Sequence, residues 1–252
     1  MRTVIIVQAR MTSTRLPGKV LLPLAGEPML TRLVERLRRV ERADAIVIAT
    51  TTNATDDAIA DLCSRLEVPC HRGSEHDVLS RYADASRLHG AHVVVRITAD
   101  CPLIDPELID QVIAVYEAGD ADYVSNMLPP TWPYGMAVEV FSASALAQAH
   151  TEARQAAERE HVTPFLYGHP ERYRLRNVAS PVDLSHHRWT VDTPEDYQLV
   201  QRLFETLYPI MPRFTQADVL QLLDRHPDWV AINQHIRQKP ATEAQISKEP
   251  TP

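Results

Sequence analysis

Three cations and three hydroxyl side chains share a short stretch near the start of the chain. The stretch reads QARMTSTRLPGK and carries Arg10, Arg15 and Lys19. Arginine can grip phosphate oxygens through its planar fork, lysine supplies a compact charge, and backbone N–H groups near Gly18 could approach a phosphate closely. These residues suit a triphosphate, and the alternative is a solvated polar loop of the same composition.

Two aspartates at the ends of strand-like segments could bind a metal ion. Asp100 follows HVVVRIT and Asp192 follows RWTV, and carboxylates placed after parallel strands reach the same sheet edge. Mg²⁺ prefers oxygen ligands, so the pair would hold Mg²⁺ between nucleotide phosphates and an incoming nucleophile. A single aspartate there is more often a helix cap or turn former, so the case depends on the pair. Asp105 and Asp196 fit those local roles instead.

Strand-like and helix-like segments alternate along the first half of the chain. Short β-branched runs predict buried strands, and apolar residues at helical spacing predict helices between them. Strands are expected at 3–9, 45–50 and 92–98, and helices at 29–40, 56–66, 78–89 and 106–117. This alternation predicts an α/β fold with a mostly parallel sheet flanked by helices. The basic stretch follows the first strand and would lie at the carboxyl edge, where ligands bind.

The regular alternation ends beyond residue 121. A proline-rich stretch leads into the alternating run MAVEVF, which predicts an antiparallel insertion over about 126–180. Further strands are expected at 172–178 and 188–191, followed by a helix over 194–208 with Thr193 as its N-cap. We expect one domain over residues 1–237, with a helical C-terminal part at about 214–237 and a disordered polar tail over 238–252.

Composition narrows the function classes. The 252 residues suffice for one large α/β domain, and a formal net charge of -7 argues against a general nucleic-acid binder, which needs a surplus of Lys and Arg. No run approaches the roughly 20 apolar residues of a membrane span, and no signal-peptide layout precedes the first strand. We therefore expect a cytoplasmic protein with neither a nucleic-acid nor a membrane partner. Three cysteines without a CxxC pair indicate neither a disulfide framework nor a zinc knuckle.

Three motifs resemble those of one enzyme family. The stretch VIIVQARMTSTRLPGKVLLPLAGEPML resembles the amino-terminal signature of the cytidylyltransferases of the spore-coat polysaccharide type, relatives of the CMP-ketodeoxyoctonate and CMP-sialic acid synthetases. RITADCPLIDP resembles the family's first metal motif, and VDTPEDY its second. The resemblance implies a nucleotide-diphospho-sugar transferase fold, GT-A-like and Rossmann-like, together with the use of Mg²⁺ and a homodimer.

The resemblance also implies roles for individual residues. Asp100 and Asp192 would bind the metal, and Asp100 would act in catalysis together with Arg10, Arg15 and Lys19. The residues implied in nucleotide binding come from the first loop and the first metal motif: Gln8, Ala9, Arg10, Ser13, Arg15, Lys19 and Asp100.

Two further segments resemble the acceptor side of the family. YGMAVEVF resembles the stretch that binds the sugar acid, which implies Gly135 and Glu139 as substrate-binding residues. EHVTP also matches the family and implies Glu160 and His161 near the site entrance, although both could equally be surface residues of a helix. The first metal motif reads ADCPL where the ketodeoxyoctonate branch has a GDEPL-like form, so the identity of the acceptor stays open.

These inferences predict a Mg²⁺-dependent cytidylyltransferase that joins CMP from CTP to an acidic sugar or related small acid, in surface polysaccharide or related biosynthesis, and releases pyrophosphate. CTP rather than UTP is implied by the resemblance alone. One alternative is a glycosyltransferase of related fold, but ADCPL lacks the second aspartate of a DxD-like metal motif. Another is a non-catalytic nucleotide-binding subunit, and retention of both aspartates and all three cations argues against it.

Overall fold

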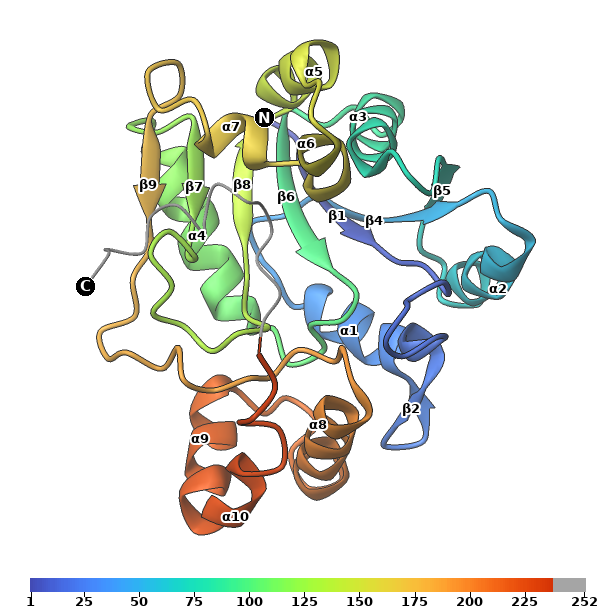
Figure 1. Ribbon diagram of the computed structural model, residues 1–252, viewed down its shortest axis with the longest axis vertical. Coiled ribbons are helices and arrows are strands. Elements are labelled where there is room, and N and C mark those ends of the chain that lie inside the picture. The colour runs from blue at the N-terminus through green and yellow to red at the C-terminus, as the bar shows by residue number, and fades with distance from the viewer. Residues whose placement is uncertain (238–252) are drawn as a thin grey trace.

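A seven-stranded sheet forms the centre of the computed structural model, which describes residues 1–237 (Figure 1). The strand order is β5-β4-β1-β6-β8-β7-β9. Within this sheet, as the structure describes it, β8 alone is antiparallel to its neighbours, β6 and β7. The sheet is thus mostly parallel with one antiparallel strand, as the sequence predicts. Its strands are β1 (Thr3–Gln8), β4 (Ala45–Thr51), β5 (Cys70–Gly73), β6 (Val93–Thr98), β7 (Tyr123–Ser125), β8 (Glu139–Ser142) and β9 (Leu175–Asn177).

Helices cover both faces of the sheet because the central strands are apolar on both faces. In β1, Ile5 and Val7 belong to one buried cluster, whereas Val4 and Ile6 belong to another, so a continuous apolar run fits a doubly covered strand. The first cluster includes residues of α1 (Met29–Leu37), α2 (Asp57–Arg65), α4 (Pro106–Glu117), α8 (Pro194–Leu207) and α9 (Gln216–Arg225). The second includes residues of α3 (Val78–Leu88), α5 (Ala143–Glu152) and α7 (Pro164–Tyr167).

Short elements complete the described chain. The two-residue strands β2 (Pro23–Leu24) and β3 (Glu27–Pro28) form a small hairpin after the 3₁₀ turn η1 (Lys19–Leu21), and a second such turn, η2 (Ala54–Asp56), precedes α2. Helix α6 (Ala156–His161) precedes α7, and α10 (Pro227–Val230) follows α9. In Figure 1 the orange and red helices α8, α9 and α10 gather beyond the sheet edge to which β6 points.

Helix caps predicted from the sequence form as expected. The Thr193 side chain accepts a hydrogen bond from the Asp196 N–H at the start of α8, and the Asp196 carboxylate accepts one from the N–H of Thr193. Asp105 accepts from the N–H of Glu107 at 3.0 Å and begins α4, which has Pro106 at its first position. Asp105 therefore acts as a cap, while Asp196 has a second role described below.

The strand predicted over residues 188–191 was wrong. The structure has one isolated parallel bridge there, between Tyr134 and Arg188. Backbone N–H groups of Trp189 and Thr190 both donate to the Tyr134 carbonyl, at 2.6 and 3.1 Å, and Val191 N–H donates to the Asp100 carbonyl at 2.8 Å. A β-ladder cannot form because these donors turn to two different loops. The same bonds tie the segment before Asp192 to Asp100 itself.

The predicted insertion over about 126–180 contains more helix than expected. Its strand starts at Glu139 rather than Met136, and α5, α6 and α7 follow it. The strand expected over 172–178 shortens to β9 and pairs parallel with β7. The short strands β5 and β7 were not predicted, because three or four residues carry too little periodic pattern.

The remaining expectations concern the C-terminal tail and the absence of a membrane span. The tail predicted over 238–252 lies outside the described residues. Across residues 1–237, each helix is too short or too polar to cross a lipid bilayer.

Candidate active site

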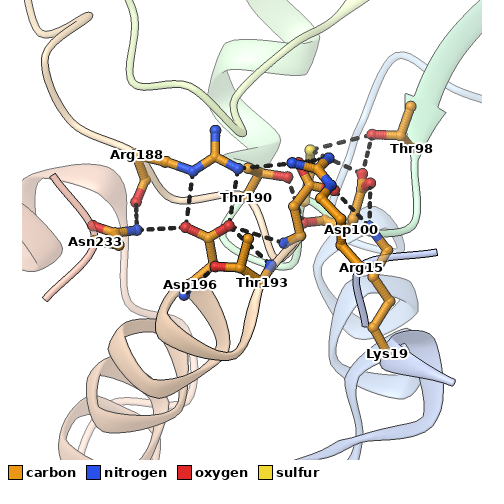
Figure 2. Close-up of polar contacts among 11 residues, drawn as sticks. Arg15, Lys19, Thr98, Asp100, Arg188, Thr190, Thr193, Asp196 and Asn233 are labelled. Carbon is orange, nitrogen blue, oxygen red and sulfur yellow. Dashed lines mark hydrogen bonds and ion pairs between the residues drawn. The ribbon is translucent and has the colours of Figure 1, made fainter. Parts of the chain in front are cut away.

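One ammonium group joins the two predicted metal-binding aspartates. Lys19 Nζ lies 2.8 Å from Asp100 Oδ2 and 2.8 Å from Asp192 Oδ1 (Figure 2). Arg15 Nη2 adds a third contact, 2.9 Å from Asp192 Oδ2. Residues 81 and 173 positions apart from Lys19 thus meet at one point beyond β6. The cationic loop and both aspartates therefore converge, as predicted, although Asp192 follows no strand and only Asp100 lies at a strand end.

The first loop reaches the aspartates because it is folded back on itself. Gly18 has φ +72°, a left-handed conformation that glycine adopts without strain, and its N–H donates to the Met11 carbonyl at 2.9 Å. Met11 N–H in turn donates to Asp56 Oδ1 at 2.8 Å, and Asp56 is fully buried. Lys19 then begins the turn η1 and is 8% exposed. A buried carboxylate far along the chain therefore anchors the loop that carries the cations.

The contacts keep Lys19 and Asp100 charged. Burial by itself lowers the pKa of Lys19, but the two carboxylates outweigh burial and raise it above its usual value. Burial likewise raises the pKa of Asp100, but Lys19 and a hydrogen bond from Thr98 Oγ1 at 2.6 Å outweigh burial and lower it. At neutral pH the cluster is an ion network whose charges compensate each other.

Arg188, Asp196 and Asn233 form a second set of polar contacts at Asp192. Arg188 donates to Asp192 Oδ2 at 3.1 Å and makes two bonds to Asp196, at 2.8 and 2.9 Å. Asn233, 2% exposed, donates to the Arg188 carbonyl and to Asp196 Oδ1 (Figure 2). Asp196 also accepts from the N–H of Asp192 at 3.1 Å. The carboxylate of Asp192 is therefore held directly by Arg188, which Asp196 and Asn233 hold in turn.

The aspartate pair fits a hard divalent cation. Both side chains offer carboxylate oxygens to a single positive group, which Lys19 supplies in this structure. Among the described residues, no group of three or more His, Cys, Asp or Glu side chains could enclose a metal. Two carboxylates that leave other positions to water and phosphate suit Mg²⁺, which keeps several waters and binds through one or two carboxylates plus substrate phosphates.

A second polar network lies along β6 and β8. Arg96 donates from Nη1 to Glu139 Oε2 and from Nη2 to Gln8 Oε1 at 3.2 Å. The other oxygen of Glu139 accepts from Tyr123 Oη and from Thr163 Oγ1, each at 2.5 Å. This network links the first strand, where the nucleotide is expected, to the strand expected to bind the acceptor.

The other nucleotide-side candidates lie apart from the aspartates. Arg10 faces Glu75, with Nη1 3.8 Å from Oε1, and its side chain is 39% exposed. Ala9 is buried, and its N–H donates to the Ala49 carbonyl at 3.1 Å, while Ser13 is half-buried in the loop. The structure therefore brings Arg15 and Lys19 to the carboxylates and leaves Arg10 on a different side of the loop.

The acceptor-side candidates also differ from one another. Gly135 has φ +112°, and a Cβ atom there would come within 2.4 Å of the Thr190 backbone nitrogen, so its observed role is close backbone contact. Glu160 is exposed on α6, whereas His161 is half-buried and burial lowers its pKa. Glu139 is 7% exposed.

Several residues of the site were not predicted as site residues. They are Arg96, Tyr123, Thr163, Arg188 and Asn233. Arg96 had a usable signal, since it is a lone charge inside the otherwise apolar strand VVVRIT. The others carry no local signal, because their partners lie far away in sequence.

The comparisons with known proteins agree on one family. A family model described as "Cytidylyltransferase" matches residues 4–221. The spore coat polysaccharide biosynthesis protein SpsF of Bacillus subtilis is 35% identical over 232 residues, which cover 88% of this chain and 94% of that protein. A 3-deoxy-manno-octulosonate cytidylyltransferase of Geobacter sulfurreducens is 34% identical over 110 residues, 43% of each chain.

A solved structure agrees with both the fold and the sequence match. It is a cytidylyltransferase from Leptospira borgpetersenii serovar Hardjo-bovis, with a TM-score of 0.87 and 30% identity. The match covers 95% of this chain and all of that one.

Proposed function

The chain belongs to the cytidylyltransferase family that includes the spore-coat polysaccharide type, and on that premise we propose that it transfers CMP from CTP to an acidic sugar or a related small acid. The names of its relatives supply the nucleotide and the kind of acceptor. The observation that carries the proposal is the contact of Lys19 and Arg15 with Asp100 and Asp192, because it joins phosphate-binding cations to metal-binding carboxylates.

The proposed reaction is an in-line displacement at phosphorus. A hydroxyl or acid oxygen of the acceptor attacks the α-phosphorus of CTP, a new P–O bond forms, and the bond to the β-phosphate oxygen breaks. Pyrophosphate leaves with the electron pair of that bond, and the proton of the attacking oxygen passes to solvent or to a nearby base. Catalysis of this kind depends mostly on positioning and on stabilising charge.

Residues of the first loop bind the triphosphate in this proposal. Arg15 and Lys19 exchange their contacts with the aspartates for contacts with phosphate oxygens, where they stabilise developing negative charge. Gln8, Ala9 and Arg10 contact the base and ribose.

Asp100 and Asp192 hold the metal in this proposal. Mg²⁺, when bound by them, supplies positive charge and an orienting centre for the phosphates. Arg188 and Thr98 keep the two carboxylates oriented when Lys19 moves away, since both contacts are independent of the first loop.

The acceptor is proposed to bind beside Glu139. Its network with Arg96 reaches Gln8, so one set of bonds would align acceptor and nucleotide. His161 borders the same region, because Thr163, two residues after it, donates to Glu139. We further propose a homodimer that works in the cytoplasm, in surface polysaccharide or related biosynthesis.

A pyrophosphate-release assay tests the proposal. The four nucleoside triphosphates are each incubated with Mg²⁺ and a panel of sugar acids and related hydroxy acids, with Asp100→Asn as the blank. We expect release that needs CTP and one class of acidic acceptor together, and mass spectrometry should find the CMP-acceptor product. Release with a nucleotide sugar as donor, and none with CTP, would instead indicate a glycosyltransferase.

A further inference from the structure

A cavity of about 190 Å³ lies between α1, α8 and the connection to α9, and half of its lining residues are arginines. Four of its eight lining residues are arginines: Arg32, Arg36, Arg39 and Arg213. None of them belongs to the nucleotide or acceptor regions described above. Glu35 is the sole acidic residue among them.

Arg36 is buried, and only one of its three guanidinium nitrogens has a hydrogen-bond partner in the described chain. It is 3% exposed, and its Nε donates to the Ile104 carbonyl at 2.8 Å. Within residues 1–237 its two terminal nitrogens, Nη1 and Nη2, are buried and have no hydrogen-bond partner. Its guanidinium lies over the Phe214 ring, 4.6 Å from the centroid, so it is fixed in place on an aromatic face. A buried donor without a partner is costly and calls for an acceptor from outside the chain.

Arg39, three residues after Arg36, also has a buried nitrogen without a hydrogen-bond partner in the described chain. Its Nη1 is buried and likewise lacks a partner in the described chain, and its Nη2 donates only weakly to the Arg213 carbonyl, at 3.3 Å. Two guanidinium groups that line the cavity thus carry three buried nitrogens without a partner in the described chain. Burial lowers the pKa of Arg36 to about 10, with Asp105 opposing this effect and Arg39 adding to it.

The remaining charges of the cavity cancel in part. Arg32 pairs with both oxygens of Glu35 at 2.9 Å, and its guanidinium lies 3.8 Å from the Tyr208 ring centroid. Tyr208 Oη also donates to Glu35 at 3.0 Å. Arg32 and Glu35 therefore neutralise each other, which leaves Arg36, Arg39 and the exposed Arg213 as the other charges that line the cavity; Asp105, outside the lining, opposes the charge of Arg36 in part.

We propose that this cavity binds a phosphate-like oxyanion, either free inorganic phosphate or the phosphate group of a small metabolite. The three unused nitrogens come from two different side chains, which suits a tetrahedral group that offers several oxygens, and the surplus of positive charge suits a dianion. The site is separate from the triphosphate loop. It adjoins the metal-binding segment, because Arg36 holds the carbonyl of Ile104, four residues after Asp100.

The proposed site is tested by calorimetric titration of the intact protein with inorganic phosphate. The titration contains no nucleotide and keeps the ionic strength constant. We expect saturable binding that Arg39→Gln weakens at least about 10-fold, because a charged hydrogen bond is lost. Arg38→Gln is the matched control, since Arg38 is the exposed neighbour on the same helix end and donates to the Leu66 carbonyl instead. It should bind phosphate like the wild type.

Further variants and ligands separate the site from the nucleotide site and from other anions. Arg15→Gln should keep the saturable binding, and Arg36→Gln, checked by circular dichroism for folding, should lose it. Pyrophosphate and glycerol phosphate distinguish free phosphate from a phosphate group on a larger molecule. Four results would each overturn the proposal. They are the absence of saturable phosphate binding, equal binding by Arg39→Gln and the wild type, loss of phosphate binding in Arg15→Gln, and a preference for acetate over phosphate.

Discussion

The two carboxylate regions of the site are held in opposite ways. Asp100 and Asp192 are paired with Lys19 and Arg15, which both come from one loop. Glu139 is held by groups from β6, β7 and the start of α7, three elements of the folded core. One region can therefore open when a single loop moves, and the other cannot change without disturbing the sheet.

This difference separates two proposed tasks. The cations that now compensate the aspartates are the groups proposed to bind phosphate. When metal and nucleotide bind, the aspartates would therefore pair with the metal and the cations with phosphate oxygens. The Glu139 network keeps its internal bonds and offers a fixed position to the acceptor. We therefore expect substitutions at the aspartate pair to act on turnover, and those at Glu139 to act on acceptor binding.

The largest effect is expected for Asp100→Asn. Loss of one metal-binding carboxylate should lower kcat by about 10³-fold or more, because charge stabilisation in the transition state is lost. Circular dichroism should show an intact fold. Asp120→Asn removes an exposed carboxylate and is the matched control with unchanged turnover. Turnover in Asp100→Asn within a few-fold of the wild type would remove Asp100 from the site.

Lys19→Met should lower kcat by about 10²-fold, because one phosphate-binding cation is removed. It also leaves two adjacent carboxylates without their shared cation, which raises the pKa of one of them in the folded state. A raised folded-state pKa means that the folded state binds the proton more tightly, so the variant gains stability as pH falls from 7 towards 5.

The wild type should behave differently over the same pH range. The folded-state pKa of Asp100 is lowered, so its contribution to stability is present above its ordinary pKa of 3.8 and is lost as pH falls below that value. That of Lys19 is raised, so its contribution is lost only as pH rises above 10.5. Melting temperatures of both proteins at pH 5 and 7 check the contrast, and parallel curves would mean that Lys19 does not compensate the pair.

Glu139→Gln should raise the KM for the acceptor about 10-fold and the KM for CTP much less, because Arg96 loses its charged partner while its bond to Gln8 can remain. The free energy of unfolding should fall by about 3 kcal/mol, since Arg96 stays buried without its counter-charge. Thr163→Val is the milder comparison, because it removes one hydrogen bond to the same carboxylate. An equal change in both KM values would contradict the separation of tasks.

The smallest effect is expected for Asn233→Ala. It removes two hydrogen bonds, to Arg188 and Asp196, and should lower stability by about 1–2 kcal/mol. Because Asp192 loses only indirect support, kcat should fall about threefold, and raised Mg²⁺ should restore part of it. Gln201→Ala, on the surface of α8, is the control. Failure of Mg²⁺ to restore any activity would argue against a positioning role.

The sequence predicted the parts of the site that depend on topology. Asp100 follows strand β6, so its place at the carboxyl edge of the sheet was predictable. Asp192 was placed beside it on the premise of a strand over 188–191 that does not form; backbone bonds from Trp189, Thr190 and Val191 to the loops of Tyr134 and Asp100 hold that segment there instead. Helix caps at Asp105 and Thr193 are local, and they too were predictable.

Contacts that depend on tertiary structure could not be read from the sequence in the same way. Nothing near Asn233 in sequence points to Arg188, 45 residues away, and the segment before Asp192 resembles a strand although it bonds to two loops. Arg96 was recognisable as an unusual charge in a buried strand, but its partner Glu139 follows from the position of β8 beside β6.

The most direct test of whether the first loop and the aspartate pair enclose a metal-bound nucleotide is a Mn²⁺-binding experiment. Electron paramagnetic resonance measures how much Mn²⁺ the protein binds in the presence of CTP. The wild-type protein and CTP together should bind Mn²⁺ more tightly than CTP binds it in solution without the protein. Asp100→Asn, Asp192→Asn and Arg15→Gln should each weaken this complex by about 10-fold or more. If the three variants bind Mn²⁺ and CTP as the wild type does, the metal and the nucleotide lie elsewhere, and the proposed site is wrong.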